Sequence, residues 1–401
     1  MSTLPNNSFT GALYTYPWDL SDEGVDRALD RIVDLTGCTE IQLTPGYHVS
    51  NYFLPHNPRS PIRFGENGAI FYQPQLSRYE ATGLKPHVSP SVTTPDYFER
   101  LVEAIERKGL VFSAWNVYFF NHHLSEKHPE FAKHDVFGTP YVGQISPSSP
   151  DAQEYAVAFT QEIMDRFKPH AVRVEALQRQ MWRHGMLKNK FQGDITERCQ
   201  FLLGVCFNPA SMRNAEEAGM DAASFRQEVD IWLRAELARI PTAADLSQPA
   251  DAEWLANAFD GRLRKYLDVL NAHTTDLWLR VAEVIRKGGG KVQSDYLAHG
   301  VRTDTNGLEP RINKHIDRLT AGLPATGDDA KALIQQYLEI IAPGGEVFVP
   351  VGPGNITEAA PLVERTRAAA DAGAAGALFY NYGLMREGVL RFVGEAMRSL
   401  P

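Results

Sequence analysis

The chain has 401 residues, of which 43% are hydrophobic and 22% charged, and its formal net charge at pH 7 is −9. This composition is typical of a soluble globular protein with a large core, and the negative charge disfavours nucleic acid and acidic membranes as partners. The N-terminal MSTLPNNSFTGALY lacks a basic region and a continuous apolar segment, and no stretch approaches the roughly 20 apolar residues that a membrane span needs. We therefore expect a cytoplasmic protein with no membrane partner.

The sequence contains three cysteines. Cys38, Cys199 and Cys206 lack CxxC spacing, so we expect buried thiols.

Short runs of β-branched and aromatic residues alternate with amphipathic segments along the first half of the chain, which is the pattern of βα units. The predicted strands lie at residues 11–16 and 40–45, from residue 110 and from residue 171, and the predicted helices at residues 21–37, 95–108 and 150–167. Ser21 is the expected N-cap of the first helix. A long loop over residues 46–93 should contain a hairpin around GENGAIFY.

The second half begins with more than a hundred residues of helical sequence. An apolar stripe over residues 259–285 marks one barrel helix, and residues 178–250 are interpreted as a helical insertion after strand four. The remaining predicted strands lie at residues 291–298, 315–323, 346–352 and 377–383, and the remaining helices at residues 328–341, 357–372 and 386–400. Eight βα units predict a single α/β domain over residues 1–401, a (β/α)₈ TIM barrel. A doubly wound sheet is the alternative, but no glycine-rich phosphate turn follows the first strand.

Two carboxylates are the candidate catalytic groups, because catalytic side chains of such barrels lie at the carboxyl ends of strands. Side chains alternate along a strand, so Arg173 and Glu175 share one face of AVRVEA and should point into the barrel mouth. Asp295 occupies the equivalent end of the next strand, and the pair could act on a glycosidic bond. The alternative is that Glu175 forms an ordinary ion pair with Arg173.

The predicted mouth is rich in aromatic, amide and imidazole side chains, which suit the apolar faces and hydroxyls of sugars. The candidate substrate-binding residues are Tyr14, Trp18, His48, His87, Trp115, Asn116, Arg173, Asn381 and Tyr382. Core packing is the competing interpretation for each single aromatic residue.

A divalent metal such as Mn, Mg or Zn is the alternative chemistry, held by Glu175, Asp295 and His315 from strands four, five and six. Sugar isomerases and epimerases of the xylose-isomerase type commonly complete such a set with a glutamate on strand eight. This chain has Asn381 there, so our main hypothesis includes no cofactor and no metal.

Several motifs of the first half resemble one group of proteins. ALYTYPWDL, GYHVSNYFLPHNPR and ISPSSPDAQEYAVA leading into VRVEAL resemble a bacterial glycoside-hydrolase-like TIM-barrel family whose members are mostly uncharacterised. The resemblance extends to about Met212. It implies a barrel related to carbohydrate enzymes, with Glu175 at the strand-four position of many glycosidase acid/bases.

The chain departs from that family in two places. Its segment after Glu175 is LQRQMWRHGMLKNKF, with only His184 in place of a histidine-rich loop. Its run over residues 206–211 keeps one cysteine, Cys206, in place of several. A changed substrate or a lost activity therefore stays open.

The main hypothesis is a glycoside hydrolase that acts on a small intracellular saccharide or glycoside. The alternatives are the metal-dependent sugar isomerase, epimerase or lyase and a non-catalytic sugar-binding barrel. Whether the protein forms a homo-oligomer stays open.

Overall fold

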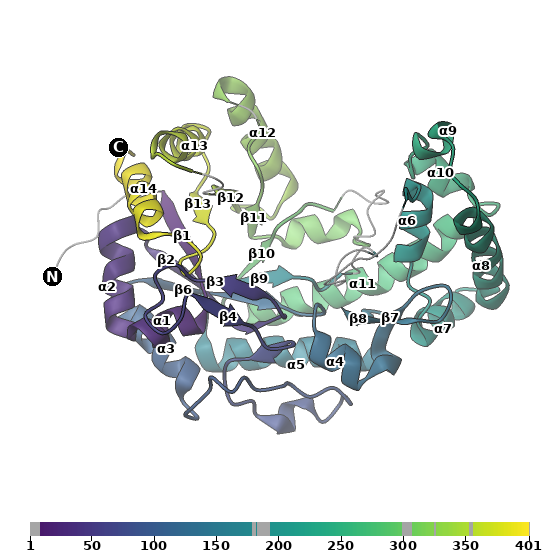
Figure 1. Cartoon of the computed structure of the whole chain (residues 1–401), viewed down its shortest axis with the longest axis horizontal. Helices are drawn as coiled ribbons and strands as arrows, with labels where there is room; N and C mark the ends of the chain where they lie inside the picture. The colour runs from purple at the N-terminus through teal and green to yellow at the C-terminus, as the bar shows by residue number, and fades with distance from the viewer. Residues whose placement is uncertain are drawn as a thin grey trace.

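Eight parallel strands close into a barrel in the computed structural model, which describes residues 9–178, 182, 193–298, 307–324, 326–352 and 356–400 (Figure 1). The strands, in order around the barrel, are β1 (Thr10–Thr15), β2 (Glu40–Tyr47), β6 (Val111–Val117), β9 (Ala171–Glu175), β10 (Lys291–Ser294), β11 (Arg318–Thr320), β12 (Glu346–Pro350) and β13 (Gly376–Phe379). β13 pairs with β1, with Thr10 opposite Gly376, which closes the ring. The predicted (β/α)₈ TIM barrel is confirmed.

Helices surround the strands, and most of them pack beside the next helix of the barrel. They are α2 (Val25–Thr36), α3 (Tyr97–Arg107), α5 (Pro150–Phe167), α11 (Arg262–Lys287), α12 (Gly327–Ile340), α13 (Ala360–Asp371) and α14 (Glu387–Arg398). The predicted N-cap at Ser21 is wrong, because Pro17 starts a separate helix, α1 (Pro17–Glu23), that contains Ser21. Gly24, with φ of 93°, then allows the chain to turn into α2.

The long loop after β2 contains two short pairings. β3 (Asn51–Phe53) and β4 (Ile62–Phe64) form an antiparallel hairpin, with Phe53 opposite Ile62. β5 (Ala69–Ile70), inside the GENGAIFY segment, pairs instead with the end of β2, where Gly46 lies opposite Ile70. The prediction of a hairpin at GENGAIFY is therefore wrong, because the strand in this segment pairs with barrel strand β2.

Between β6 and α5 lie α4 (His122–Lys127) and the antiparallel strands β7 (Ala132–His134) and β8 (Pro140–Ile145). Five helices follow β9: α6 (Glu197–Gly204), α7 (Pro209–Glu217), α8 (Ala222–Ala238), α9 (Ala243–Leu246) and α10 (Ala252–Asn257). Together with the first half of α11, helices α6, α7, α8 and α10 bury a hydrophobic cluster that includes Phe225, Leu233 and Tyr266. The division into one barrel domain with an insertion at residues 178–250 stays a prediction.

The barrel interior contains charged and polar side chains near the amino ends of the strands. Glu40 on β2 and Arg318 on β11 form a buried ion pair of 2.6 Å. One step toward the carboxyl ends, Nε2 of Gln42 donates to Oε1 of Gln293 at 3.0 Å. Both pairs join strands that do not neighbour each other in the barrel wall.

In the described parts of the chain, no helix is both long and apolar enough to cross a membrane.

Candidate active site

Two acidic side chains meet at the carboxyl ends of adjacent strands. Glu175 is the last residue of β9, and Asp295 directly follows β10. Val172 and Val174 are buried against the helices, so strand alternation turns Arg173 and Glu175 toward the barrel interior, as predicted. The Glu175 and Asp295 side chains are 28% and 23% exposed, so both side chains are partly exposed.

Arg173 contacts both carboxylates. Its Nη2 lies 2.7 Å from Oδ2 of Asp295 and 3.3 Å from Oε2 of Glu175, and its Nε donates to the same Oδ2 at 2.8 Å. The guanidinium also lies 4.8 Å from the ring centre of Tyr14. The predicted ion pair between Arg173 and Glu175 is therefore present, and it forms part of a three-charge cluster with a formal charge of −1.

Trp115 on β6 holds the other side of Glu175. Its Nε1 donates to Oε2 of Glu175 at 2.5 Å, and its ring packs 4.9 Å from that of Tyr14. Trp115 is 1% exposed, so it has little surface for a substrate. The structure therefore brings four of the predicted site residues, Tyr14, Trp115, Arg173 and Glu175, into contact around Asp295.

Asp295 is the carboxylate with a perturbed acidity. Burial raises the pKa of Asp295 above its ordinary value, Arg173 opposes this increase, and the negative charge of Glu175 adds to it. Its Oδ1 is buried. A pair of carboxyl groups in unequal environments is suited to one proton donor and one ionised partner.

Several predicted binding residues lie outside this cluster. Asn116 is on the opposite face of β6 from Trp115, where its Nδ2 donates to the Tyr118 hydroxyl beside α5, so strand alternation places it against the helices. Trp18 is 1% exposed and stacks on Tyr16 with ring centres 4.5 Å apart. Neither side chain is placed to touch a sugar bound at Glu175.

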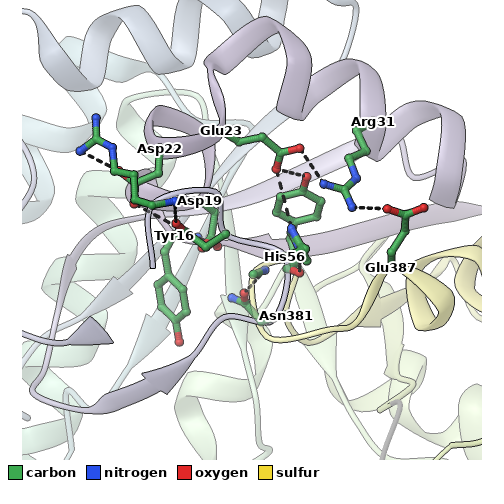
Figure 2. A network of polar contacts seen from close by, with 12 residues as sticks. Tyr16, Asp19, Asp22, Glu23, Arg31, His56, Asn381 and Glu387 are labelled. Atoms are coloured by element: carbon green, nitrogen blue, oxygen red, sulfur yellow. Dashed lines mark hydrogen bonds and ion pairs between the residues drawn. The ribbon is translucent and has the colours of Figure 1, made fainter. Parts of the chain in front are cut away.

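Asn381 and Tyr382 belong to a separate polar network between α1 and the segment after β13 (Figure 2). The Tyr382 hydroxyl donates to Oε2 of Glu23 at 2.7 Å, and Oδ1 of Asn381 accepts from the Gly383 amide at 3.0 Å. Both side chains are fully buried, so the prediction that they contact substrate is not supported.

The two histidines that were predicted to bind substrate, His48 and His87, lie in different parts of the structure. His48 stacks on Tyr47 with ring centres 4.2 Å apart and donates from Nδ1 to the Val49 carbonyl at 2.8 Å. Tyr47 in turn packs 4.8 Å from Trp115, so His48 lies one ring behind the site. His87 stacks on His123 at 4.1 Å, and no contact between described residues joins it to the carboxylates.

The predicted metal set is not assembled. Strand six begins at Arg318, and His315 ends a 3₁₀ helix (Pro310–His315) that precedes it, near the amino end of that strand. Glu175 and Asp295 lie at carboxyl ends, so His315 cannot join them. Among the described residues, no group of three histidine, cysteine, aspartate or glutamate side chains is arranged to hold a metal ion.

Tyr380 is the site residue that the sequence analysis missed. It follows β13, its ring centre lies 5.6 Å from that of Tyr14 and 5.8 Å from that of Trp115, and it is 40% exposed. Its position directly before Asn381 at the end of strand eight was the available signal. The segment LQRQMWRHGMLKNKF, in which the chain departs from the family that it resembles, lies outside the described residues apart from Leu177, Gln178 and Trp182.

Comparison of the structure with known proteins finds glycoside hydrolases. The catalytic domain of a β-amylase from Paenibacillus polymyxa matches with a TM-score of 0.55 and 10% identity over 98% of this chain and 99% of that one. An α-L-fucosidase from Paenibacillus thiaminolyticus matches with a TM-score of 0.54 and 14% identity over 97% of this chain and 49% of that one. A GH42 β-galactosidase from G. stearothermophilus matches with a TM-score of 0.55 and 10% identity, over 98% and 57% of the two chains.

This chain thus spans about half the length of the fucosidase and somewhat more of the β-galactosidase. No family model matches the sequence, and no curated protein matches it. At this level of identity the likeness establishes the fold, which is the fold that the resemblance in the first half of the chain implied.

Proposed function

We propose that this protein hydrolyses a small glycoside and that Glu175 and Asp295 are its catalytic carboxylates. The observation that carries the proposal is that these two side chains, at the carboxyl ends of β9 and β10, both contact Nη2 of Arg173 while remaining partly exposed. The fold shared with three glycoside hydrolases supports the same reaction class.

The spacing of the carboxylates favours a double displacement. Glu175 Oε2 and Asp295 Oδ2 lie 3.3 and 2.7 Å from one nitrogen, so these oxygens are closer together than the roughly 6.5 to 9.5 Å that separates the carboxyl groups of inverting enzymes. Inverting enzymes need that gap for a water molecule. The shorter separation supports a mechanism with a glycosyl-enzyme intermediate.

In the proposed reaction, a carboxylate oxygen of Asp295 attacks the anomeric carbon as the bond to the leaving-group oxygen breaks. Glu175 gives its proton to that oxygen. Water then attacks the same carbon, Glu175 takes a proton from the water, and the bond to Asp295 breaks. Burial raises the pKa of Asp295, which by itself would suit the proton donor. The role of Asp295 as nucleophile therefore depends on Arg173, whose two N–H groups on Oδ2 favour the ionised form. No cofactor takes part in these steps.

Glu175→Gln and Asp295→Asn test the proposal on a panel of 4-nitrophenyl glycosides, with product analysis by chromatography. Loss of the acid/base should lower kcat/KM by about 10² to 10⁴. Glu106→Gln and Asp34→Asn, at exposed positions on α3 and α2, are the matched controls. A Glu175→Gln enzyme within about tenfold of wild type contradicts the assignment, and binding of a saccharide without any product supports a non-catalytic barrel.

A more reactive leaving group separates the two roles. With a 2,4-dinitrophenyl glycoside the leaving group needs no proton, so Glu175→Gln should still release dinitrophenol in a first turnover whereas Asp295→Asn should not. The reverse pattern would exchange the two roles. The cytoplasmic location and the small size of the substrate stay predictions from the sequence.

A further inference from the structure

Tyr380 differs from the other aromatic residues of the site in its exposure. Tyr14, Tyr16, Tyr47 and Trp115 are between 1% and 9% exposed, whereas Tyr380 is 40% exposed. The aromatic side chains at the mouth therefore form mainly a buried wall. Tyr380 is the member of this set that presents a large part of its surface to a solute.

Two buried hydroxyls hold the Tyr380 hydroxyl. It lies 2.8 Å from the Tyr16 hydroxyl and 3.5 Å from the Tyr47 hydroxyl. Burial raises the pKa of both Tyr16 and Tyr47, so these groups remain protonated hydrogen-bonding partners at neutral pH. A phenol fixed at its oxygen and packed edge-to-face on Tyr14 and Trp115 has little freedom left.

The position of the ring connects it to the carboxylates. Trp115 packs against Tyr380 and donates to Glu175, while Tyr14 packs against Tyr380 and lies under Arg173. Tyr380 is thus separated from each charged group by one aromatic ring.

We propose that Tyr380 is the platform on which a sugar ring of the substrate stacks, with the Tyr16 and Tyr47 hydroxyls setting its orientation. This proposal rests on the glycoside substrate class of the proposed function. A flat, partly exposed ring suits the apolar face of a pyranose, and the phenol oxygen retains hydrogen-bonding capacity for a sugar hydroxyl. Tyr380 then determines affinity, and the carboxylates determine turnover.

Three variants test these contributions. Tyr380→Ala removes the platform, Tyr380→Phe removes its hydroxyl, and Tyr16→Phe removes the partner at 2.8 Å. Phe64→Ala is the control for loss of an exposed aromatic ring, since Phe64 on β4 is 75% exposed. Tyr97→Phe is the control for loss of a hydroxyl, because the Tyr97 hydroxyl donates to Oγ of Ser21 at 3.0 Å.

The probes are 4-nitrophenyl thioglycosides of D-glucose, D-galactose and L-fucose, which bind without being hydrolysed, and the corresponding O-glycosides. We expect Tyr380→Ala to raise Kd and KM by about tenfold or more, with a smaller change in kcat, and the two Phe variants to raise Kd by about threefold. Both controls should match wild type. Circular dichroism and Tm of each variant establish that it folds.

The outcomes separate this proposal from the proposed function. If wild type hydrolyses a glycoside but Tyr380→Ala binds the thioglycoside as tightly as wild type, the platform is overturned and the hydrolase stands. If Tyr380→Ala weakens thioglycoside binding, Phe64→Ala does not, and no O-glycoside is hydrolysed, the platform is supported and the hydrolase fails. If no probe binds wild type, both are overturned.

Discussion

Nε1 of Trp115 donates a hydrogen bond of 2.5 Å to Oε2 of Glu175. The same oxygen lies 3.3 Å from Nη2 of Arg173, so the indole and the guanidinium fix the carboxylate from two sides. Trp115 is therefore a positioning residue for Glu175 rather than a surface for the sugar. A group that must give and take a proton at one atom depends on such support.

Trp115→Phe keeps an aromatic ring between Tyr14 and Tyr47 but removes the donor to Glu175. We expect kcat to fall by about 10- to 150-fold with little change in KM, because the loss of one charge-assisted hydrogen bond is about 1.5 to 3 kcal/mol. Steady-state kinetics provides the measurement. Trp278→Phe on α11 is the matched control, because the buried Trp278 indole has no acceptor among the described residues. Equal kcat values for the two variants would contradict the role.

Arg173→Met should change the pH dependence of activity. Arg173 lowers the pKa of Asp295 against the effect of burial, so its loss lets that pKa rise further. Because the nucleophile must be ionised, the acid limb of the kcat/KM profile should move to higher pH. Arg107→Met, at an exposed ion pair on α3, controls for the loss of a positive charge. An acid limb at the wild-type position would exclude this coupling.

The stereochemical outcome tests the carboxylate spacing. The two oxygens lie 2.7 and 3.3 Å from one guanidinium nitrogen, so they are closer together than the carboxyl groups of inverting enzymes, and we expect the first-formed sugar to keep the anomeric configuration of the substrate. Proton NMR of the reaction in its first minutes, before mutarotation, distinguishes the anomers. An inverted first product would require the carboxylates to move apart when substrate binds.

Asp19 should make the stability of the fold depend on pH. Burial raises the pKa of its carboxyl to about 7, against the amides of Tyr16 and Gly383, from an ordinary value of 3.8. The folded state therefore holds a proton that the unfolded state has released. The free energy of unfolding then falls as pH rises from about 4 to about 7, by up to about 4 kcal/mol.

Asp19→Asn removes this titration. Urea unfolding at pH 4.5, 6 and 8 should show the variant gaining stability relative to wild type as pH rises. Asp34→Asn, at an exposed position on α2, makes the same change in charge without burial. Parallel stability curves for Asp19→Asn and wild type would contradict the assignment.

The ion pair of Glu40 and Arg318 should matter for stability and little for turnover. Both side chains are 3% exposed or less, and Glu40→Gln leaves a buried guanidinium whose remaining carboxylate, Glu346, is 3.3 Å away. We expect a loss of about 3 to 5 kcal/mol in the free energy of unfolding, measured in urea, with kcat within about threefold of wild type. Asp26→Asn, which breaks the exposed pair with Arg107, should leave the free energy of unfolding close to that of wild type. Similar losses for the two variants would refute this difference.

The strands of the barrel were predictable because hydrophobic periodicity is a local property. The inward direction of Glu175 followed from the apolar positions Val172 and Val174 on the same strand. The start of the first helix was not, because Ser21 is a good N-cap and the competing start at Pro17 depends on how Tyr16 and Asp19 meet. In that case one local signal lost to another, because the Tyr16 amide donates to Asp19 three residues on and Pro17 occupies the first helical position.

The binding residues were harder to predict, since an aromatic residue near a strand end is equally suited to core and surface. Asn116 and Trp115 are neighbours in sequence but lie on opposite faces of β6, and only one faces the carboxylates. Strand eight shows the same problem, because Tyr380 reaches solvent while Tyr382 is buried on Glu23. The face of each side chain is set by strand register around the closed barrel, which no single segment contains.

Helix α11 belongs to two hydrophobic clusters at once. In its first half, Leu263, Tyr266 and Leu270 pack with residues of α6, α7, α8 and α10. In its second half, Leu277 and Ile285 pack on the barrel. The helix has 26 residues and is about 39 Å long, so each half alone would be a helix of about 13 residues, which is marginal in water. Melting of either cluster therefore frays the helix that the other one needs, and the two parts of the protein lose their structure in a cooperative transition.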